Sequence, residues 1–386
     1  MHRTSALLIA VLLALHFSVT AAGQAVHKTE SASQWQPGIF YSWGKVVTFE
    51  KASYRCMYSH TAVSDWTPPT AVALWQPVGT RTVASKQSSK IPPSTTKRVF
   101  APYIHMSETN NNLPEIQAAS GLKFFTLAFI VSDGGCSPAW QGETSLPLSN
   151  EKLFSERIDA VRKSGGDVII SFGGYVGKEL ALACPDAATL TAVYQAVVDK
   201  YKARSLDFDI EASAASDAAS IERRSDALSR LATANPGLQI SFTVPVFATG
   251  MPQTALDLLK SAQKNNVPVS IVNLMTMDYG QPVPEGNMGP VGIVAVEKAI
   301  SQLRSLGLTA AIGITPMIGR NDTVGETFTL TDANAIFSYA QSNSAVRRLS
   351  MWSVGRDRGG CIGTVSPTCS GIDQVEWAFT RVFNEF

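Results

Sequence analysis

The 386-residue chain carries almost no net charge, because 32 Lys and Arg residues oppose 31 Asp and Glu residues. A net charge of +1 gives no excess of positive side chains for nucleic acid or for an acidic membrane surface. Neither is therefore expected as a partner. Beyond the N-terminal segment, no apolar run approaches the roughly 20 residues that a membrane-spanning helix needs.

Metal-binding and phosphate-binding patterns are also missing. The five histidines are scattered, and the five cysteines form no Cys-x-x-Cys pair, so a zinc site is not expected. The first strand-like run, 99–104, continues into His105 and Met106 without a glycine-rich turn. That absence disfavours a nucleotide-binding open sheet.

The N-terminus has the pattern of a secretory signal peptide. A positively charged start is followed by a short apolar run over 7–15 and by small residues, Ala21, Ala22 and Ala25. We expect residues 1–25 to be removed and the protein to be extracellular, where disulfides are permitted. Cys361 and Cys369 bracket a short loop and are the favoured pair; Cys136–Cys184 is a second pairing, and the odd count leaves at least one thiol unpaired.

The chain divides into two compositional regions. Residues 34–77 are dense in aromatic side chains, and alternation over 45–49 predicts a small β module at 30–78. Residues 79–98 are rich in Ser, Thr, Lys and Pro and predict a solvated linker.

From residue 99 to 386, strand-like runs recur every 30–40 residues with helical patterns between them. The predicted strands are 99–104, 124–131, 168–172, 206–210, 238–244, 271–277, 310–314 and 349–352. The predicted helices are 151–163, 187–201, 221–234, 254–265, 291–306 and 331–342. Eight strands alternating with helices predict an α/β fold of the (β/α)8 TIM-barrel type, with a doubly wound open sheet as the alternative.

The predicted fourth strand is the most informative stretch of the chain. Alternation places Asp207, Asp209 and Glu211 on one face, about 6–7 Å apart along the backbone, and apolar residues on the other. Crowded carboxyl groups raise at least one pKa, which suits acid–base chemistry. The alternative, a solvated edge strand, conflicts with the apolar opposite face.

Other polar and glycine-rich motifs also follow predicted strands, where a barrel would gather its functional groups. They are Ser171-Phe172-Gly173-Gly174, Met277-Asp278-Tyr279 and Trp352.

These motifs together resemble family 18 glycoside hydrolases, the chitinases and their relatives. The matching runs are Asp207-Phe208-Asp209-Ile210-Glu211, Ser171-Phe172-Gly173-Gly174, Met275-Thr276-Met277-Asp278-Tyr279 and Trp352. The resemblance implies hydrolysis of β-1,4-linked N-acetylglucosamine by a substrate-assisted retaining mechanism that needs no cofactor.

The resemblance also implies roles for single residues. Glu211 would be the general acid and base, Asp209 would hold the acetamido N–H, and Asp207 would share a proton behind it. Tyr279 or Asp278 would orient the acetamido oxygen, and Trp352 would stack under the sugar. Ser171, Gly173, Gly174 and Met277 belong to the matched motifs and are expected at the substrate site.

The N-terminal module resembles small chitin-binding modules of bacterial chitinases. The matching residues are Tyr54-Arg55-Cys56, His60-Thr61, Asp65-Trp66-Thr67-Pro68 and Ala73-Leu74-Trp75. The resemblance implies that Trp66 is exposed and lies on the polysaccharide. Trp75 and Tyr54 are expected in the core, and Tyr58 could serve either role.

Two departures and two alternative functions stay open. Arg204-Ser205 stands where the family has Asp-Gly, and Met277 stands where many relatives have Tyr. A lectin-like binder would lack the acid Glu211, and a hydrolase of N-glycans would not need a chitin-binding module. Trp140 is a candidate for a further sugar subsite. His105 could line the cleft or be a core histidine with satisfied hydrogen bonds. We expect the protein to be a monomer that acts on chitin.

Overall fold

The computed structural model describes residues 32–72, 74–78, 97–106, 112–143, 148 and 151–386. The predicted signal peptide and nearly all of the predicted linker lie outside these residues. No helix among the described residues is long and apolar enough to cross a membrane.

The N-terminal residues form a small β domain. Its main sheet has the order β1-β3-β4-β6, and β2 pairs with β5. The bounds are Ser33–Gln34, Phe40–Tyr41, Val46–Phe49, Ala52–Cys56, His60–Thr61 and Trp75–Val78 for β1 to β6. Val47, Cys56, Leu74 and Trp75 are fully buried between these strands, which confirms a β module and a core position for Trp75.

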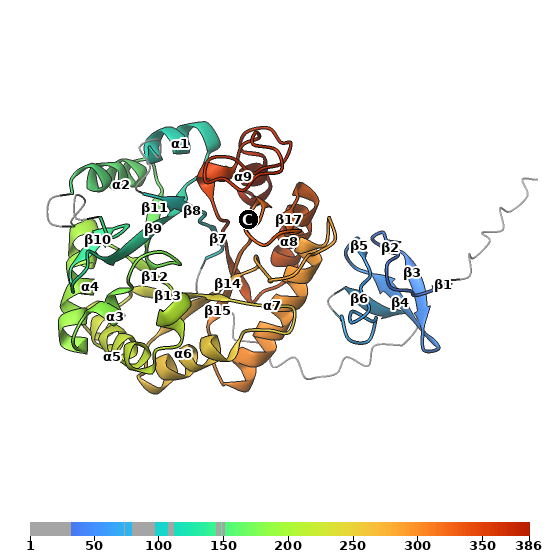
Figure 1. Ribbon diagram of the computed structural model, residues 1–386, viewed down its shortest axis with the longest axis horizontal. Helices are drawn as coiled ribbons and strands as arrows, with labels where there is room; N and C mark the ends of the chain where they lie inside the picture. Colours follow the sequence, from blue (N-terminus) through green and yellow to red (C-terminus); the bar gives the residue numbers. More distant parts are fainter. Residues whose placement is uncertain (1–31, 73, 79–96, 107–111, 144–147, 149–150) are drawn as a thin grey trace, which may run out of the picture.

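The large domain is a curled, mainly parallel sheet with helices outside it, as Figure 1 shows along the axis of the curl. The strand order is β10-β9-β11-β12-β13-β14-β15-β18-β7, with β8 paired to β9. The bounds are Val99–Phe100 (β7), Tyr103–His105 (β8), Phe124–Ser132 (β9), Pro138–Trp140 (β10), Asp167–Gly173 (β11), Ser205–Asp209 (β12), Gln239–Pro245 (β13), Val269–Met275 (β14), Ala311–Thr315 (β15) and Val346–Leu349 (β18). Outside this sheet, β16 (Gly319–Arg320) pairs with β17 (Thr327–Phe328).

The predicted first strand is interrupted and touches both ends of the curl. β7 pairs with β18, and β8 pairs with β9 two residues later. Across the interruption, the Tyr103 amide donates to the Met351 carbonyl at 3.0 Å, and the Thr126 amide donates to the Pro102 carbonyl at 2.9 Å. Residues 99–105 therefore pair with β18, the last strand in the sequence, and with β9.

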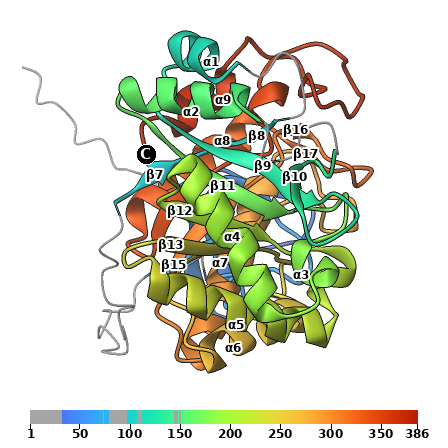
Figure 2. The ribbon, with the colours of Figure 1, turned by 90° about the vertical axis from the view of Figure 1, so that its left-hand side faces the viewer.

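Helices cover the outer face of the strands; α2, α4, α5 and α6 lie over it in Figure 2. The helix bounds are Leu113–Ser120 (α1), Leu153–Lys163 (α2), Leu180–Ala183 (α3), Ala187–Tyr201 (α4), Ala218–Ala234 (α5), Gln253–Lys264 (α6), Met288–Ser305 (α7), Leu330–Ser342 (α8) and Ala378–Phe383 (α9), with short 3-10 turns Ala212–Ala215 (η1) and Val354–Arg356 (η2).

Helix α4 shows how the local sequence specifies an element. Asp186 caps it by accepting a 2.8 Å hydrogen bond from the Thr189 amide, and Lys202 ends it in a left-handed conformation. Leu190, Tyr194, Val197, Val198 and Tyr201 are buried, at the spacing of one helical face. The predicted bounds 187–201 are confirmed.

Strand β12 carries the predicted two faces. On its outer face, the Phe208 ring stacks on Phe172 with centroids 5.1 Å apart and meets Tyr194 of α4 edge-on at 5.2 Å. On its inner face, Asp207 and Asp209 are buried inside the curl. The helix-packed outer face rules out a solvated edge strand.

The cysteine pairing is as predicted. Disulfides join Cys136 to Cys184 and Cys361 to Cys369. Cys56 is the unpaired thiol and lies in the core of the small domain, where burial raises its pKa to about 12.

The last predicted strand is displaced. β18 covers Val346–Leu349 rather than 349–352. Trp352 follows the strand and makes an isolated parallel bridge with Met317. The shift leaves Trp352 at the rim of the sheet instead of inside the ladder.

Candidate active site

A cavity of about 680 Å³ opens where the parallel strands end. Its wall brings together Asp209, Glu211, Met277, Asp278 and Trp352, which the sequence placed on three separate predicted strands. The remaining lining residues are Tyr103, His105, Phe129, Gln141, Tyr175, Val176, Thr243, Met275, Thr315, Met317, Asp322 and Thr323. The sequence left His105 open between a cleft position and a core histidine with satisfied hydrogen bonds, and the structure places it in the cavity lining.

Asp207 lies beneath this cavity and is fully buried. Its carboxyl oxygens are 2.6–3.0 Å from the hydroxyls of Tyr103, Ser171, Ser241 and Thr243. Arg348 Nη1 lies 3.6 Å from Oδ1. This shell of hydroxyl donors and a guanidinium stabilises negative charge on Asp207.

Asp209, two residues further along β12, lies in a different environment. It is 5 % exposed, and its Oδ1 has no hydrogen-bond partner among the described residues. Burial, then the charges of Glu211 and Asp207, raise its pKa well above the usual range. The pKa of Asp209 is therefore raised by its burial and by the neighbouring carboxyl groups, whereas Asp207 is surrounded by hydrogen-bond donors.

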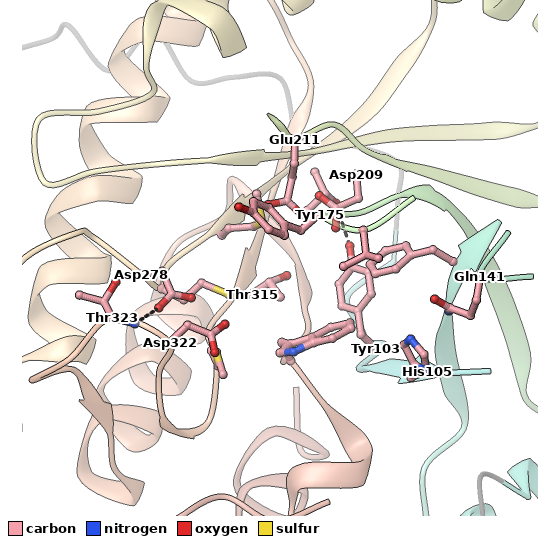
Figure 3. A pocket seen from close by; sticks show the side chains of 17 residues that line it. Tyr103, His105, Gln141, Tyr175, Asp209, Glu211, Asp278, Thr315, Asp322 and Thr323 are labelled. Atoms are coloured by element: carbon pink, nitrogen blue, oxygen red, sulfur yellow. Dashed lines mark hydrogen bonds between the residues drawn. The ribbon is translucent and has the colours of Figure 1, made fainter. Parts of the chain in front are cut away.

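Glu211 stands just past the end of β12, in extended backbone immediately before η1. Figure 3 shows its side chain and that of Asp209 directed into the cavity from the same strand end. Burial, then the charge of Asp278, raise the pKa of Glu211 to about 7. A carboxyl group with that pKa can both give and take a proton near neutral pH.

Asp278 and Asp322 lie on the wall across from His105 and Gln141 (Figure 3). Asp278 has a left-handed backbone conformation, with φ of 48°. The Thr323 amide donates a 2.8 Å hydrogen bond to Asp278 Oδ1. Burial raises the pKa of Asp278 despite that hydrogen bond.

The cavity has an aromatic wall. The rings of Trp352 and Phe129 stack with centroids 5.7 Å apart and planes 14° from parallel. The Tyr103 ring packs against both, at 6.1 and 6.0 Å. Such a platform can bury the apolar C–H face of a sugar ring.

The residues of the predicted Ser-x-Gly-Gly run support the site from behind instead of lining it. Ser171 bonds to Asp207, and the Gly174 amide donates a 2.9 Å hydrogen bond to the Asp209 carbonyl. A Cβ on Gly173 would lie 2.0 Å from that carbonyl oxygen, and a Cβ on Gly174 would lie 2.7 Å from the Phe129 ring. Glycine is needed here because β11, β12 and Phe129 approach closely.

The prediction that Trp140 forms a sugar subsite is wrong. Trp140 is fully buried, and its Nε1 donates a 2.8 Å hydrogen bond to the Tyr201 hydroxyl of α4. Phe154 packs edge-on against its ring at 5.5 Å. Strand β10 turns this tryptophan toward the helices, away from the cavity.

Tyr279 does not join the acidic residues. The left-handed turn at Asp278 leaves Asp278 in the cavity, while Tyr279 lines a second cavity of about 810 Å³ between the two domains. Its hydroxyl is buried without a hydrogen-bond partner among the described residues. Asp278 is therefore the better placed of the two candidates for orienting a substrate.

Trp66 is not the freely exposed ring that was expected. It is half-buried, packs against residues of the large domain and lines the second cavity. Tyr58 also faces the large domain, with its ring 6.5 Å from that of Tyr339. Trp43 is 73 % exposed and is the tryptophan of the small domain that faces solvent.

Sequence reasoning missed several residues of the site. Tyr103 and Arg348 hold Asp207, while Gln141, Tyr175 and Asp322 line the cavity. Tyr103, inside the predicted strand 99–104, was the available signal, because buried polar groups need partners. Nothing in the sequence connected Arg348 to Asp207, which precedes it by 141 positions.

No group of three or more potential metal-ligating side chains occurs in the described part of the chain.

Comparison with known proteins adds independent information. Residues 34–76 match the model of carbohydrate-binding module family 5/12. A "Probable bifunctional chitinase/lysozyme" of Escherichia coli (strain K12) is 31% identical over 385 residues, covering 92% of this chain and 41% of that protein. Endochitinase 11 of Metarhizium anisopliae is 31% identical over 350 residues, covering 85% and 65%. The chain thus spans less than two thirds of either relative.

Solved structures include active domain 2 of a chitinase from Pyrococcus furiosus. It aligns with a TM-score of 0.67 and 34% identity, covering 76% of this chain and 97% of that domain. Catalytic-site mutants of the same domain have been solved with chito-oligosaccharides, at the same similarity.

Proposed function

Because the chain belongs to the chitinases, a group of glycoside hydrolases, we propose that it hydrolyses the β-1,4 linkages of chitin. The single observation that carries the proposal is Glu211, a carboxyl group with a pKa of about 7 in a cavity walled by Trp352 and Phe129. A proton donor beside an aromatic sugar platform suits glycosidic cleavage.

The proposed reaction is the substrate-assisted retaining mechanism of family 18. Glu211 gives its proton to the glycosidic oxygen as the bond from that oxygen to C1 breaks. The carbonyl oxygen of the sugar's own 2-acetamido group attacks C1 and forms an oxazolinium ion. Water then attacks C1, the bond from C1 to the acetamido oxygen breaks, and the water gives a proton to Glu211. Because C1 is inverted twice, the net result is retention.

The neighbouring carboxyl groups have distinct proposed tasks. Asp209 has an unpartnered Oδ1 that can accept a hydrogen bond from the acetamido N–H. Asp278 lines the cavity, and its charge raises the pKa of Glu211 and so helps that carboxyl group to keep its proton; only the protonated form of Asp278 could donate a hydrogen bond to the acetamido oxygen. Asp207 lies beneath them and keeps the acidic strand in place through its contacts with hydroxyl groups and Arg348.

We also propose that the curled sheet is the closed (β/α)8 barrel of family 18. The support is the pairing of β7 with β18 and of β8 with β9, with backbone hydrogen bonds on both sides between them. The active site then lies at the C-terminal ends of the strands, where barrels of this type place it.

The module at 30–78 is proposed to bind chitin and, after export of the chain, to hold it on the polymer. The match to a carbohydrate-binding module over 34–76 and its exposed Trp43 support this assignment.

The test uses a chromogenic chitobioside and a defined chitin oligomer. Wild-type protein should release dye and give β-anomeric products first, whereas Glu211→Gln should lose at least about 10²-fold in turnover. Glu222→Gln, at a half-exposed position on α5, is the matched control. A protein that binds both substrates without cleaving them would be a lectin, and cleavage of N-glycans alone would indicate the other hydrolase.

A further inference from the structure

The small domain is docked on the large domain through α7 and α8, on whose side it lies in Figure 1. The Asn287 side chain, 1 % exposed, accepts a hydrogen bond from the Thr61 amide at 2.8 Å and donates one to the Thr61 carbonyl at 2.6 Å. Val294 of α7 belongs to the same apolar cluster as the core of the small domain. These contacts give the small domain a defined place.

The docking encloses the second cavity, which we call the junction cavity. The small domain contributes Asp65, Trp66 and Thr70 to its lining, and the large domain contributes Phe247, Gln281 and Lys298. Its volume of about 810 Å³ lies within the roughly 300–1,000 Å³ of small-molecule binding sites.

The chain that lines the active-site cavity runs directly on into the lining of the junction cavity. Asp278 lines the active-site cavity, and the next residues, from Tyr279 to Pro284, line the junction cavity. Phe247 follows β13, the strand next to β12 and its catalytic carboxyl groups. The two cavities thus flank the same loop at the end of β14.

We propose that the junction cavity is an outer subsite of the cleft, in which Trp66 and Phe247 hold N-acetylglucosamine units of the chain being cleaved. This inference rests on the proposed chitinase function. It makes the small domain part of the substrate path, in addition to any role in binding the solid polymer.

The lining has the chemistry of a sugar site. Trp66, half-buried, and Phe247, 37 % exposed, offer apolar surface to the C–H faces of pyranose rings. Asp65, Gln281 and Lys298 offer acceptors and donors for hydroxyl and acetamido groups. A purely apolar partner would leave these polar side chains without compensation.

The experiment compares a long and a short soluble substrate on the full chain. The readout is the ratio of kcat/KM for chitohexaose to kcat/KM for a chromogenic chitobioside. Only the hexamer carries enough sugar units to leave some free for an outer subsite when two of its units flank the cleaved bond. Trp66→Ala should lower this ratio about tenfold, a loss of about 1.4 kcal/mol of binding, because the aromatic surface under the sugar ring is removed.

Two further variants keep the test decisive. Phe247→Ala, on the opposite wall and in the other domain, should lower the ratio in the same direction even if Trp66→Ala fails to fold. Phe40→Ala is the matched control, because Phe40 is 64 % exposed in the small domain and does not line the cavity.

Each outcome has one meaning. Unchanged ratios in both variants, with loss only of binding to insoluble chitin in Trp66→Ala, would overturn the inference and make Trp66 a polymer anchor. A wild-type protein that cleaves neither substrate would instead refute the proposed function, and this inference with it. A lowered ratio in Phe40→Ala equal to that in Trp66→Ala would also overturn it.

Discussion

Arg348 Nη1 lies 3.6 Å from Asp207 Oδ1, and both side chains are buried inside the curl of strands. Arg348 Nη1 also donates a 2.9 Å hydrogen bond to the Ser241 hydroxyl, which in turn contacts Asp207. The carboxyl group at the bottom of the acidic strand is therefore held by a cation from the last strand of the sheet.

Replacing Arg348 with Met should destabilise the fold by about 3–5 kcal/mol, because it leaves the Asp207 charge buried without its cation. Urea unfolding measures the loss. The double variant Asp207→Asn/Arg348→Met should recover part of it, since neither charge remains. A single Arg348→Met variant within about 0.5 kcal/mol of wild type would contradict this assignment.

The pH profile of kcat/KM should report Glu211. Because its pKa is raised to about 7, the acid form persists at neutral pH, and activity should fall as pH rises above about 7. Asp278→Asn removes a charge that raises this pKa, so the descending limb should move to lower pH. Asp257→Asn, at an exposed position on α6, should leave the limb in place. A wild-type limb near pH 4.5 would contradict the prediction.

The same raised pKa has a consequence for folding stability. The folded state holds the Glu211 proton between the ordinary pKa of 4.5 and about 7, whereas the unfolded chain releases it. The contribution of this group to stability is therefore present below pH 4.5 and is lost as pH rises toward 7. Glu211→Gln should remove that part of the pH dependence in urea unfolding measured across this range.

Gly173→Ala should lower the free energy of unfolding far more than Gly165→Ala does. Both glycines have positive φ, 95° and 81°, so both substitutions incur backbone strain of about 1 kcal/mol. Only at Gly173 would the new Cβ meet another strand, 2.0 Å from the Asp209 carbonyl oxygen. We expect at least about 2 kcal/mol of additional destabilisation by urea unfolding, with reduced turnover. Equal losses at the two positions would refute the close approach of β11 and β12.

Trp43→Ala should weaken binding of the full chain to insoluble chitin about tenfold, and more than Trp66→Ala does. Trp43 is 73 % exposed, whereas Trp66 is half-buried against the large domain. A flat polymer surface can reach the first ring directly. Depletion from solution by chitin particles measures binding, and Trp43→Tyr should retain most of it. The reverse order of Trp43 and Trp66 would restore the original assignment of Trp66.

Local patterns were enough to predict much of this protein. Alternation over 205–211 separated the carboxyl groups from the helix-packed face, because side chains of a strand alternate whatever surrounds it. The helical pattern over 187–201 predicted the bounds of α4 to the residue. Both disulfides followed from loop length and the order of the strands.

Tertiary structure decided which way the large aromatic side chains face. Trp140 and Trp66 carry no local signal of their burial, because the partners that cover them, Tyr201 and the α7 face, lie far away in the sequence. Tyr279 lies outside the active-site cavity because the backbone takes a left-handed conformation at Asp278. Arg204, an unusual residue at the head of the acidic strand, is 80 % exposed and pairs with Asp167 outside the cavity.

The sequence by itself thus determined which carboxyl groups share a face and which elements carry them, since both depend on periodicity along the chain. Only the tertiary structure decided their surroundings. Asp207 gained hydroxyl donors from three strands and Arg348 from a fourth, while Asp209, two residues away, was buried with an unpartnered oxygen and a raised pKa. A pKa depends on desolvation and on nearby charge, and both are set by residues brought together from across the fold.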